Sequence, residues 1–266
     1  MRVRWIVLLT VSIAVLAGTM VWAFAGSTVT SVLGFGGAER DTDEDFGAVV
    51  VHDVDADGIL SPEPDRRARE VWDEFTRVVT PDFAAATIRQ YRVGDNPDSD
   101  TLAYVYRDAD PRLWVFAANL AYADDPDLLL STLVHEYAHI LSLGADDTDH
   151  GSDSCETVQT NEGCLRPEAA LASFQQRFWS GYEDAPDPDN DDPDRAWEFY
   201  QDHEDDFVSD YAATNVAEDF AESFMTYVLE ERSDADTVIG EKLRFFDGQP
   251  EYAEARDRIR TEFAFG

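Results

Sequence analysis

The amino-acid sequence predicts an α+β fold, because strand-like segments come mainly in its first half and helical segments in its second half. The strand-like segments are short and rich in apolar residues, and lie at 49–51, 87–93, 101–107 and 113–118. One helix, over 66–79, is predicted among them. Of the 266 residues 44% are hydrophobic, which is enough for an ordinary buried core. We therefore expect one folded domain over residues 47–266.

The composition is strongly acidic. The chain has 56 Asp and Glu against 20 Lys and Arg, a formal net charge of −36. This charge excludes nucleic-acid binding through a basic surface, so no nucleic-acid partner is expected. It is also expected to favour neutral or basic ligands over acidic ones near any cleft.

The N-terminal residues 1–25 predict a membrane-crossing helix or a signal peptide. Arg2 and Arg4 precede an uncharged run, Trp5–Ala25, about as long as the roughly 20 residues that span a bilayer. The run ends in the small-x-small sequence typical of signal-peptidase cleavage, so a retained anchor and a cleaved signal both stay open. Residues 26–46 are predicted to be a linker. Basic residues favour the cytoplasmic side, so the domain is expected outside the cell, anchored or secreted.

Helical segments dominate from residue 125 onward. Asp125 is predicted as an N-cap and Pro126 as the first helical residue of a helix over 125–143, with Gly144 just beyond its end. Three further predicted helices lie at 167–179, 195–207 and 215–231. The tail to residue 266 is predicted to be helical and peripheral. Asp and Pro alternate over 185–194, which indicates a solvated loop.

Cys155 and Cys164 are the only cysteines, and both lie in a polar stretch. In an oxidising compartment this pair predicts one disulfide that closes a short loop. Two free thiols or a metal-binding pair are the alternatives.

The 125–143 helix contains the sequence His135-Glu136-Tyr-Ala-His139. Residues four apart share one helix face, so both imidazoles can bind one Zn²⁺ while Glu136 lies beside its open side. A catalytic zinc takes three protein ligands and one water. A third histidine of the extended motif is excluded, because Ser142 and Ala145 occupy the positions for its glycine and histidine.

The third ligand is therefore expected from a carboxylate elsewhere in the chain. The 215–231 helix offers Glu218 and Glu222, one turn apart on the same side. The residue types and their spacing leave both as candidates.

The segment Tyr211-Ala-Ala-Thr-Asn-Val-Ala-Glu218 resembles the third-ligand segment of the gluzincin peptidases related to the lethal factor of anthrax toxin, and of putative zinc metallopeptidases of bacterial envelopes. The resemblance covers two segments and roughly twenty residues. It implies a zincin-like metallopeptidase fold, with His135, His139 and Glu218 as ligands and Glu222 as a supporting carboxylate. Glu136 would be the general base and Tyr211 the phenol that donates to the oxyanion.

The resemblance also implies the reaction and the way in which the substrate binds. Peptide or protein substrates would be hydrolysed by a zinc-bound water, and an extended peptide would add to the edge strand at 113–118. The expected function is therefore an extracytoplasmic zinc peptidase. One alternative is a zinc-binding envelope module without catalytic activity.

A calcium-binding surface protein is the other alternative. Asp53, Asp55 and Asp57, followed by Gly58, copy the start of an EF-hand loop. Pro64 stands where the loop requires a bidentate glutamate. Calcium is thus a possible second cofactor, and an acidic turn is the competing interpretation.

Overall fold

The computed structural model describes residues 40–265, except 152–153 and 233–235. The predicted anchor or signal segment, residues 1–25, lies outside the described residues. Within the described ranges, no helix combines the length and the apolar character that a bilayer crossing requires.

The observed architecture confirms the α+β class. Its strands are β1 (Arg40–Asp43), β2 (Gly47–Val54), β3 (Leu60–Ser61), β4 (Ile88–Gly94), β5 (Ala103–Arg107), β6 (Trp114–Asn119), β7 (Thr148–Asp149), β8 (Gln159–Thr160) and β9 (Gly163–Leu165). Its α-helices are α1 (Arg66–Val79), α2 (Pro81–Thr87), α3 (Pro126–Ser142), α4 (Ala170–Phe178), α5 (Pro193–His203), α6 (Val216–Leu229), α7 (Val238–Phe245) and α8 (Pro250–Glu262). Short 3₁₀ turns, among them η2 (Glu204–Asp206) and η3 (Tyr211–Ala213), connect several of them.

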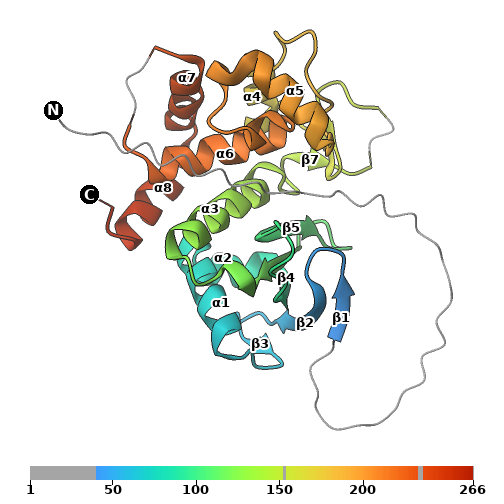
Figure 1. Cartoon of the computed structure of the whole chain (residues 1–266), viewed down its shortest axis with the longest axis vertical. Coiled ribbons are helices and arrows are strands. Elements are labelled where there is room, and N and C mark those ends of the chain that lie inside the picture. The colour runs from blue at the N-terminus through green and yellow to red at the C-terminus, as the bar shows by residue number, and fades with distance from the viewer. Residues whose placement is uncertain (1–39, 152–153, 233–235, 266) are drawn as a thin grey trace.

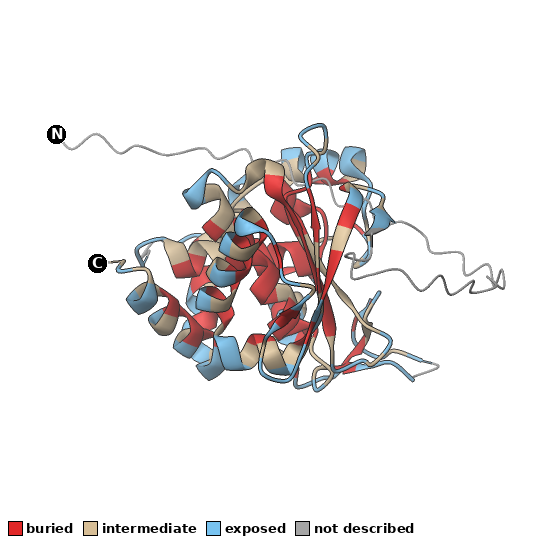
Figure 2. Cartoon of the chain, turned by 90° about the horizontal axis from the view of Figure 1, so that it is seen from below, coloured by how far each residue is buried: buried red, intermediate tan, exposed pale blue. Residues whose placement is uncertain are grey.

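The main sheet has the strand order β1-β2-β4-β6-β5, and β3 pairs with the end of β2. Strands β4 and β6 run parallel, whereas the other pairs run antiparallel. Most of the helices lie on one side of this sheet, and the buried residues concentrate there (Figure 2). Phe75 of α1 stacks on Phe116 of β6 with ring centroids 4.3 Å apart, which joins helix and sheet in one core.

Helices α3 and α6 lie side by side near the middle of the molecule. The sheet and α1 lie on one side of this pair, and α4, α5 and α7 on the other (Figure 1). Aromatic side chains of α4, α6 and the turn after α7 fill the second half of the core, with Phe174, Phe220 and Phe246 all fully buried. The two halves of the chain therefore meet at the helix pair that carries the histidine motif.

Three sequence expectations need correction. Residues 40–43, expected in the linker, form strand β1, because Asp43 accepts hydrogen bonds from the N–H groups of Asp45 and Phe46 and turns the chain into β2. The 113–118 segment is a strand but not the edge, because β5 pairs outside it. The tail is helical but not peripheral, since Phe246 and Ile259 are fully buried.

Candidate metal centre

Helix α3 presents both histidines to the interior. Its first turn is fixed by the Asp125 carboxylate, which accepts the N–H groups of Asp127 and Leu128. His135 is 2% exposed and Glu136 is 3% exposed. A buried histidine and a buried carboxyl side by side need polar partners, and α6 supplies several of them.

Helix α6 begins at a well-defined N-cap. Asn215 Oδ1 accepts the N–H groups of Ala217 and Glu218, at 2.9 and 3.0 Å. This start places both Glu218 and Glu222 on the face that packs against α3. Their positions along the helix pair differ: Glu218 lies near Nε2 of both histidines, and Glu222 lies near Nδ1 of His135.

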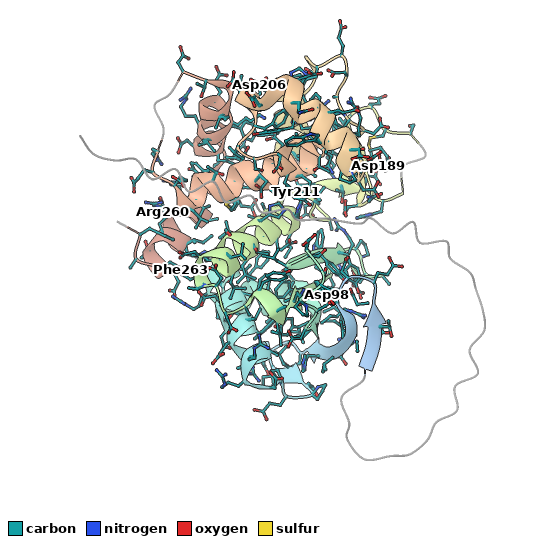
Figure 3. All side chains as sticks on the ribbon, in the orientation of Figure 1. Asp98, Asp189, Asp206, Tyr211, Arg260 and Phe263 are labelled. Carbon is teal, nitrogen blue, oxygen red and sulfur yellow. A yellow bond between two sulfur atoms is a disulfide. The ribbon has the colours of Figure 1, made fainter. Side chains whose placement is uncertain are left out.

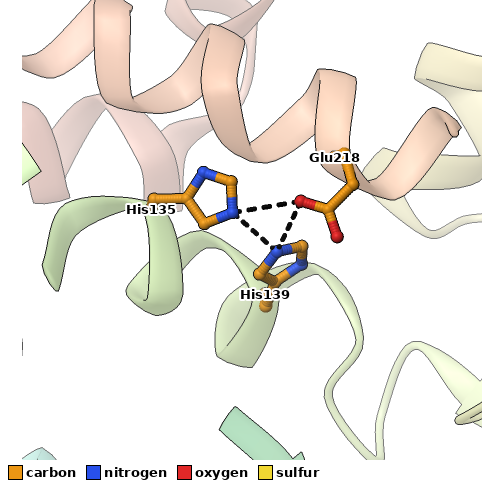
Figure 4. Close-up of side chains that lie close together, drawn as sticks. All are labelled: His135, His139 and Glu218. Atoms are coloured by element: carbon orange, nitrogen blue, oxygen red, sulfur yellow. Dashed lines mark hydrogen bonds and ion pairs between the residues drawn. The ribbon is translucent and has the colours of Figure 1, made fainter. Parts of the chain in front are cut away.

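Glu218 completes a three-residue cluster with His135 and His139 (Figure 4). The two Nε2 atoms lie 3.0 Å apart, and Glu218 Oε2 lies 3.1 Å from that of His135 and 3.3 Å from that of His139. In the described part of the chain, this is the only group of three or more His, Cys, Asp or Glu side chains whose ligand atoms gather within 4.8 Å. The cluster could hold a metal ion.

Glu222 orients the first histidine. Its Oε1 lies 2.8 Å from His135 Nδ1. A carboxylate only accepts, so Nδ1 carries the proton and donates, which leaves Nε2 free to bind a cation. The other oxygen, Oε2, accepts from the Ser209 hydroxyl at 2.7 Å. Glu222 therefore supports a candidate ligand and is not one of the three.

Hydrogen bonds and charges within the cluster shift the pKa values of its three side chains in the directions opposite to those that burial alone would give. Burial alone would raise the pKa of Glu218, but the charge of His139 and hydrogen bonds from both histidines hold it well below its usual range. Burial would likewise lower the pKa of His135, but its hydrogen bonds to Glu218 and Glu222 raise it well above the ordinary value. The pKa of His139 is raised against burial by the charge of Glu218. These directions describe two histidines that hold protons beside an ionised carboxylate.

Glu136 behaves differently from the other carboxyl groups. Burial raises its pKa to about 7, and the charges of His135 and His139 only partly oppose that shift. A carboxyl group with a pKa near neutrality can exchange a proton in either direction at physiological pH. Such a group beside a candidate metal cluster is a typical functional-site feature.

Tyr211 comes from turn η3, directly before α6. Its ring centroid lies 5.8 Å from that of His135. Its hydroxyl is buried, and no hydrogen bond of ordinary geometry reaches it within the described ranges, although the Glu218 carboxylate lies close enough to interact with it. Burial raises its pKa well above the ordinary value, and the nearby charges of Glu218 and Glu136 add to the shift. The phenol therefore stays neutral, with its proton available for donation.

A pocket opens onto the cluster. Strand β5 contributes Tyr104 and Val105 to its lining, and two further segments contribute residues 160–162 and 188–191. Residues of α3 and α6 form the part that holds the cluster. Carboxylates of Glu162, Asp189 and Asp191 belong to this lining, and no Lys or Arg does. Figure 3 labels Asp189 and Tyr211 in the same view.

The 188–191 loop is fixed to the helix that carries Glu218. Asn190 Nδ2 donates to the Thr214 carbonyl oxygen at 2.9 Å, and Asn215 Nδ2 donates to the Asn190 carbonyl oxygen at 3.1 Å. The sequence favoured a solvated Asp-Pro spacer over a cation-binding segment, and nothing in the alternating pattern predicted that this loop lines a pocket.

The remaining predicted sites have different outcomes. Cys155 and Cys164 form the predicted disulfide, and Cys164 lies in β9 of a small second sheet with order β7-β9-β8. Asp53, Asp55 and Asp57 form no metal-ligand group of the kind described above. The Asp55 carboxylate instead accepts the N–H groups of Asp57 and Ile59, as in an ordinary acidic turn.

Sequence reasoning missed Ser209 and the Val105 backbone, which lies at the Glu136 carboxyl. Neither belongs to a local motif, so only the fold brings them to the site. Comparison with known proteins adds no identity, because no family model, no curated protein and no solved structure matches this chain.

Proposed function

We propose that this protein is a zinc-dependent peptidase whose metal is held by His135, His139 and Glu218. The observation that carries the proposal is the buried Glu136 carboxyl, which lines the same pocket as this cluster. A structural metal site needs no such group. A hydrolytic site needs a base of this kind.

The donor set fits zinc. Two imidazole nitrogens and one carboxylate oxygen are the ligands of a frequent class of catalytic zinc sites, which keep a fourth position open. Bonds of 2.0–2.1 Å in a tetrahedron place ligand atoms about 3.3–3.4 Å apart. The observed separations of 3.0, 3.1 and 3.3 Å are close to those edges.

Zinc at this site would acidify a water molecule and polarise the carbonyl group of the scissile peptide. Glu136 would accept the proton of the attacking water and pass it to the leaving amine, because its carboxyl lines the pocket beside the three candidate ligands. The neutral Tyr211 hydroxyl would donate to the developing oxyanion. Glu222 would hold the His135 ring throughout, since it accepts from Nδ1.

The substrate is proposed to be an extended peptide that adds to β5, the strand at the free edge of the sheet beside the pocket. The carboxylates of Glu162, Asp189 and Asp191 favour peptides with basic side chains at this position. The disulfide agrees with the expected placement of the domain outside the cytoplasm, anchored by the N-terminal segment or secreted.

Metal analysis of the full-length chain tests the proposal. Wild type should hold one zinc per chain, and His139→Ala and Glu218→Ala should lose it. His203→Ala is the matched control, because that histidine pairs with Asp184 outside the cluster. A folded wild type that takes up no zinc would refute the proposal.

Activity separates a peptidase from a zinc-binding module without catalysis. Glu136→Gln should keep its zinc and lose about 10²–10⁴-fold in the rate of hydrolysis of a fluorogenic peptide library, because an amide cannot accept the proton. If wild type and variant both bind zinc and neither hydrolyses any peptide, the result would favour the non-catalytic zinc-binding module.

A further inference from the structure

One hydroxyl group joins two parts of the candidate site that come from different segments. Ser209 lies between η2 and η3, and its Oγ donates to Glu222 Oε2 at 2.7 Å. The other oxygen of the same carboxylate accepts from His135 Nδ1 at 2.8 Å. The Glu222 side chain is only 8% exposed. Both oxygens of a buried carboxylate are thus held, one by the ligand and one by Ser209.

The same Oγ also accepts a hydrogen bond. The N–H group of Ala212 donates to it at 3.1 Å. Ala212 is the middle residue of turn η3 and directly follows Tyr211. The Ser209 hydroxyl therefore contacts the turn that carries the phenol on one side and the carboxylate that orients His135 on the other.

We propose that Ser209 is a positioning residue, whose hydroxyl sets the orientation of the His135 ligand through Glu222 and couples it to the turn that carries Tyr211. The inference rests on the proposed function, because it concerns the affinity of the same metal site. Without the hydroxyl, Oε2 of Glu222 loses the partner that fixes its rotation. The Glu222 carboxylate then no longer holds the His135 ring, which donates to Oε1, in one orientation.

A purely structural role for Ser209 makes a different prediction. A buried serine of α6, Ser223, donates to the Asp219 carboxylate at 3.2 Å. Asp219 pairs with Lys242 and not with a histidine. Ser223→Ala therefore removes the same kind of hydrogen bond without affecting the carboxylate that orients a ligand, and it serves as the matched control.

The experiment measures the affinity of the full-length chain for Zn²⁺ and Co²⁺ by competition with a chelator. Ser209→Ala should weaken binding by roughly tenfold, at the low end of the 10–100-fold range for groups that support metal ligands. It should also shift the visible absorption of bound Co²⁺, which reports ligand geometry. Ser209→Thr keeps the hydroxyl and should restore both properties, and Ser223→Ala should leave both at the wild-type level.

A double-mutant cycle tests whether Ser209 acts through Glu222. Glu222→Ala alone should weaken binding, and adding Ser209→Ala to it should have no further effect, because the carboxylate through which Ser209 acts is then gone. Unchanged affinity in Ser209→Ala, an equal loss in Ser223→Ala, or additive losses in the double variant would each overturn the inference while leaving the proposed function intact. A wild-type protein that binds neither Zn²⁺ nor Co²⁺ would overturn the proposed function and this inference together. That result comes from the wild type alone, so it is distinct from a failure seen only in the variants.

Discussion

Replacing Lys242, the only lysine of the chain, by methionine is expected to destabilise the fold strongly. Its Nζ lies 2.7 Å from Asp219 Oδ2 and donates to the Asp206 carbonyl oxygen at 2.7 Å. Both side chains of the ion pair are fully buried. Asp219 also accepts from Trp179 Nε1 at 2.7 Å and from Ser223 Oγ at 3.2 Å. The pair joins α7 to α6 directly beside Glu218.

The magnitude follows from the charge that remains. Methionine keeps most of the lysine volume, so lost packing is a minor part. Removing one partner of a buried ion pair costs about 3–5 kcal/mol, because the other charge stays buried without compensation. The two remaining hydrogen bonds to Asp219 place the expected loss near the lower end, at about 3 kcal/mol.

The loss should depend on pH. Burial already raises the pKa of Asp219 in the folded protein, in spite of the attraction of Lys242. In the Lys242→Met variant that pKa rises further above the unfolded-state value. A carboxyl with a raised folded pKa destabilises the fold increasingly as the pH rises, so the penalty should be larger at pH 7 than at pH 5.

Urea unfolding of wild type, Lys242→Met and Lys242→Met/Asp219→Asn at both pH values measures these effects. The double variant should recover much of the loss, because a neutral amide can still accept from Trp179 and Ser223. A single variant within about 1 kcal/mol of wild type at pH 7 would refute the reasoning. So would a double variant no more stable than the single one.

Three further predictions concern the candidate metal centre and the pocket beside it. Tyr211→Phe should keep zinc and lose roughly 10²–10³-fold in hydrolysis rate, measured as kcat beside metal content, and loss of zinc would contradict the donor role. Zinc affinity should rise as the pH rises through the raised pKa values of His135 and His139, by up to about tenfold per pH unit for each proton that zinc displaces. Over the same pH range the metal-free protein should lose the stability that the protonated histidines contribute. A chelator titration that shows no pH dependence would contradict this prediction. Asp189→Asn/Asp191→Asn should reduce the preference for basic over neutral peptides in a library assay at low salt, and an unchanged preference would remove the acidic wall from the substrate model.

Much of the fold and the centre of the site could be predicted because the signals are local. Asp125 and Pro126 define the start of α3 within one turn, and the spacing of His135 and His139 places both on one face. The four strand segments were also found from their apolar, β-branched composition. Chemistry that depends on i, i+4 spacing or on capping is encoded in a few neighbouring residues.

The remaining features depend on contacts between distant segments. Glu218 and Glu222 are alike in sequence, and only the packing of α6 on α3 makes one a candidate ligand and the other the support of His135. The edge strand was misassigned because β5, which comes before β6 in the chain, pairs outside it. Strand order and the partners of Ser209 are set by the whole fold, so no local pattern could reveal them.

Both loops that wall the pocket, residues 160–162 and 188–191, come from the stretch of chain between His139 and Glu218. The candidate ligand atoms of His135, His139 and Glu218 lie on two helices that pack directly against each other. Changes of length or sequence in these loops can therefore alter the lining of the pocket while the candidate metal centre stays in place. Loop exchange is the natural engineering route to new selectivity in this scaffold, and a transplanted loop would keep Asn190, which fastens it to α6.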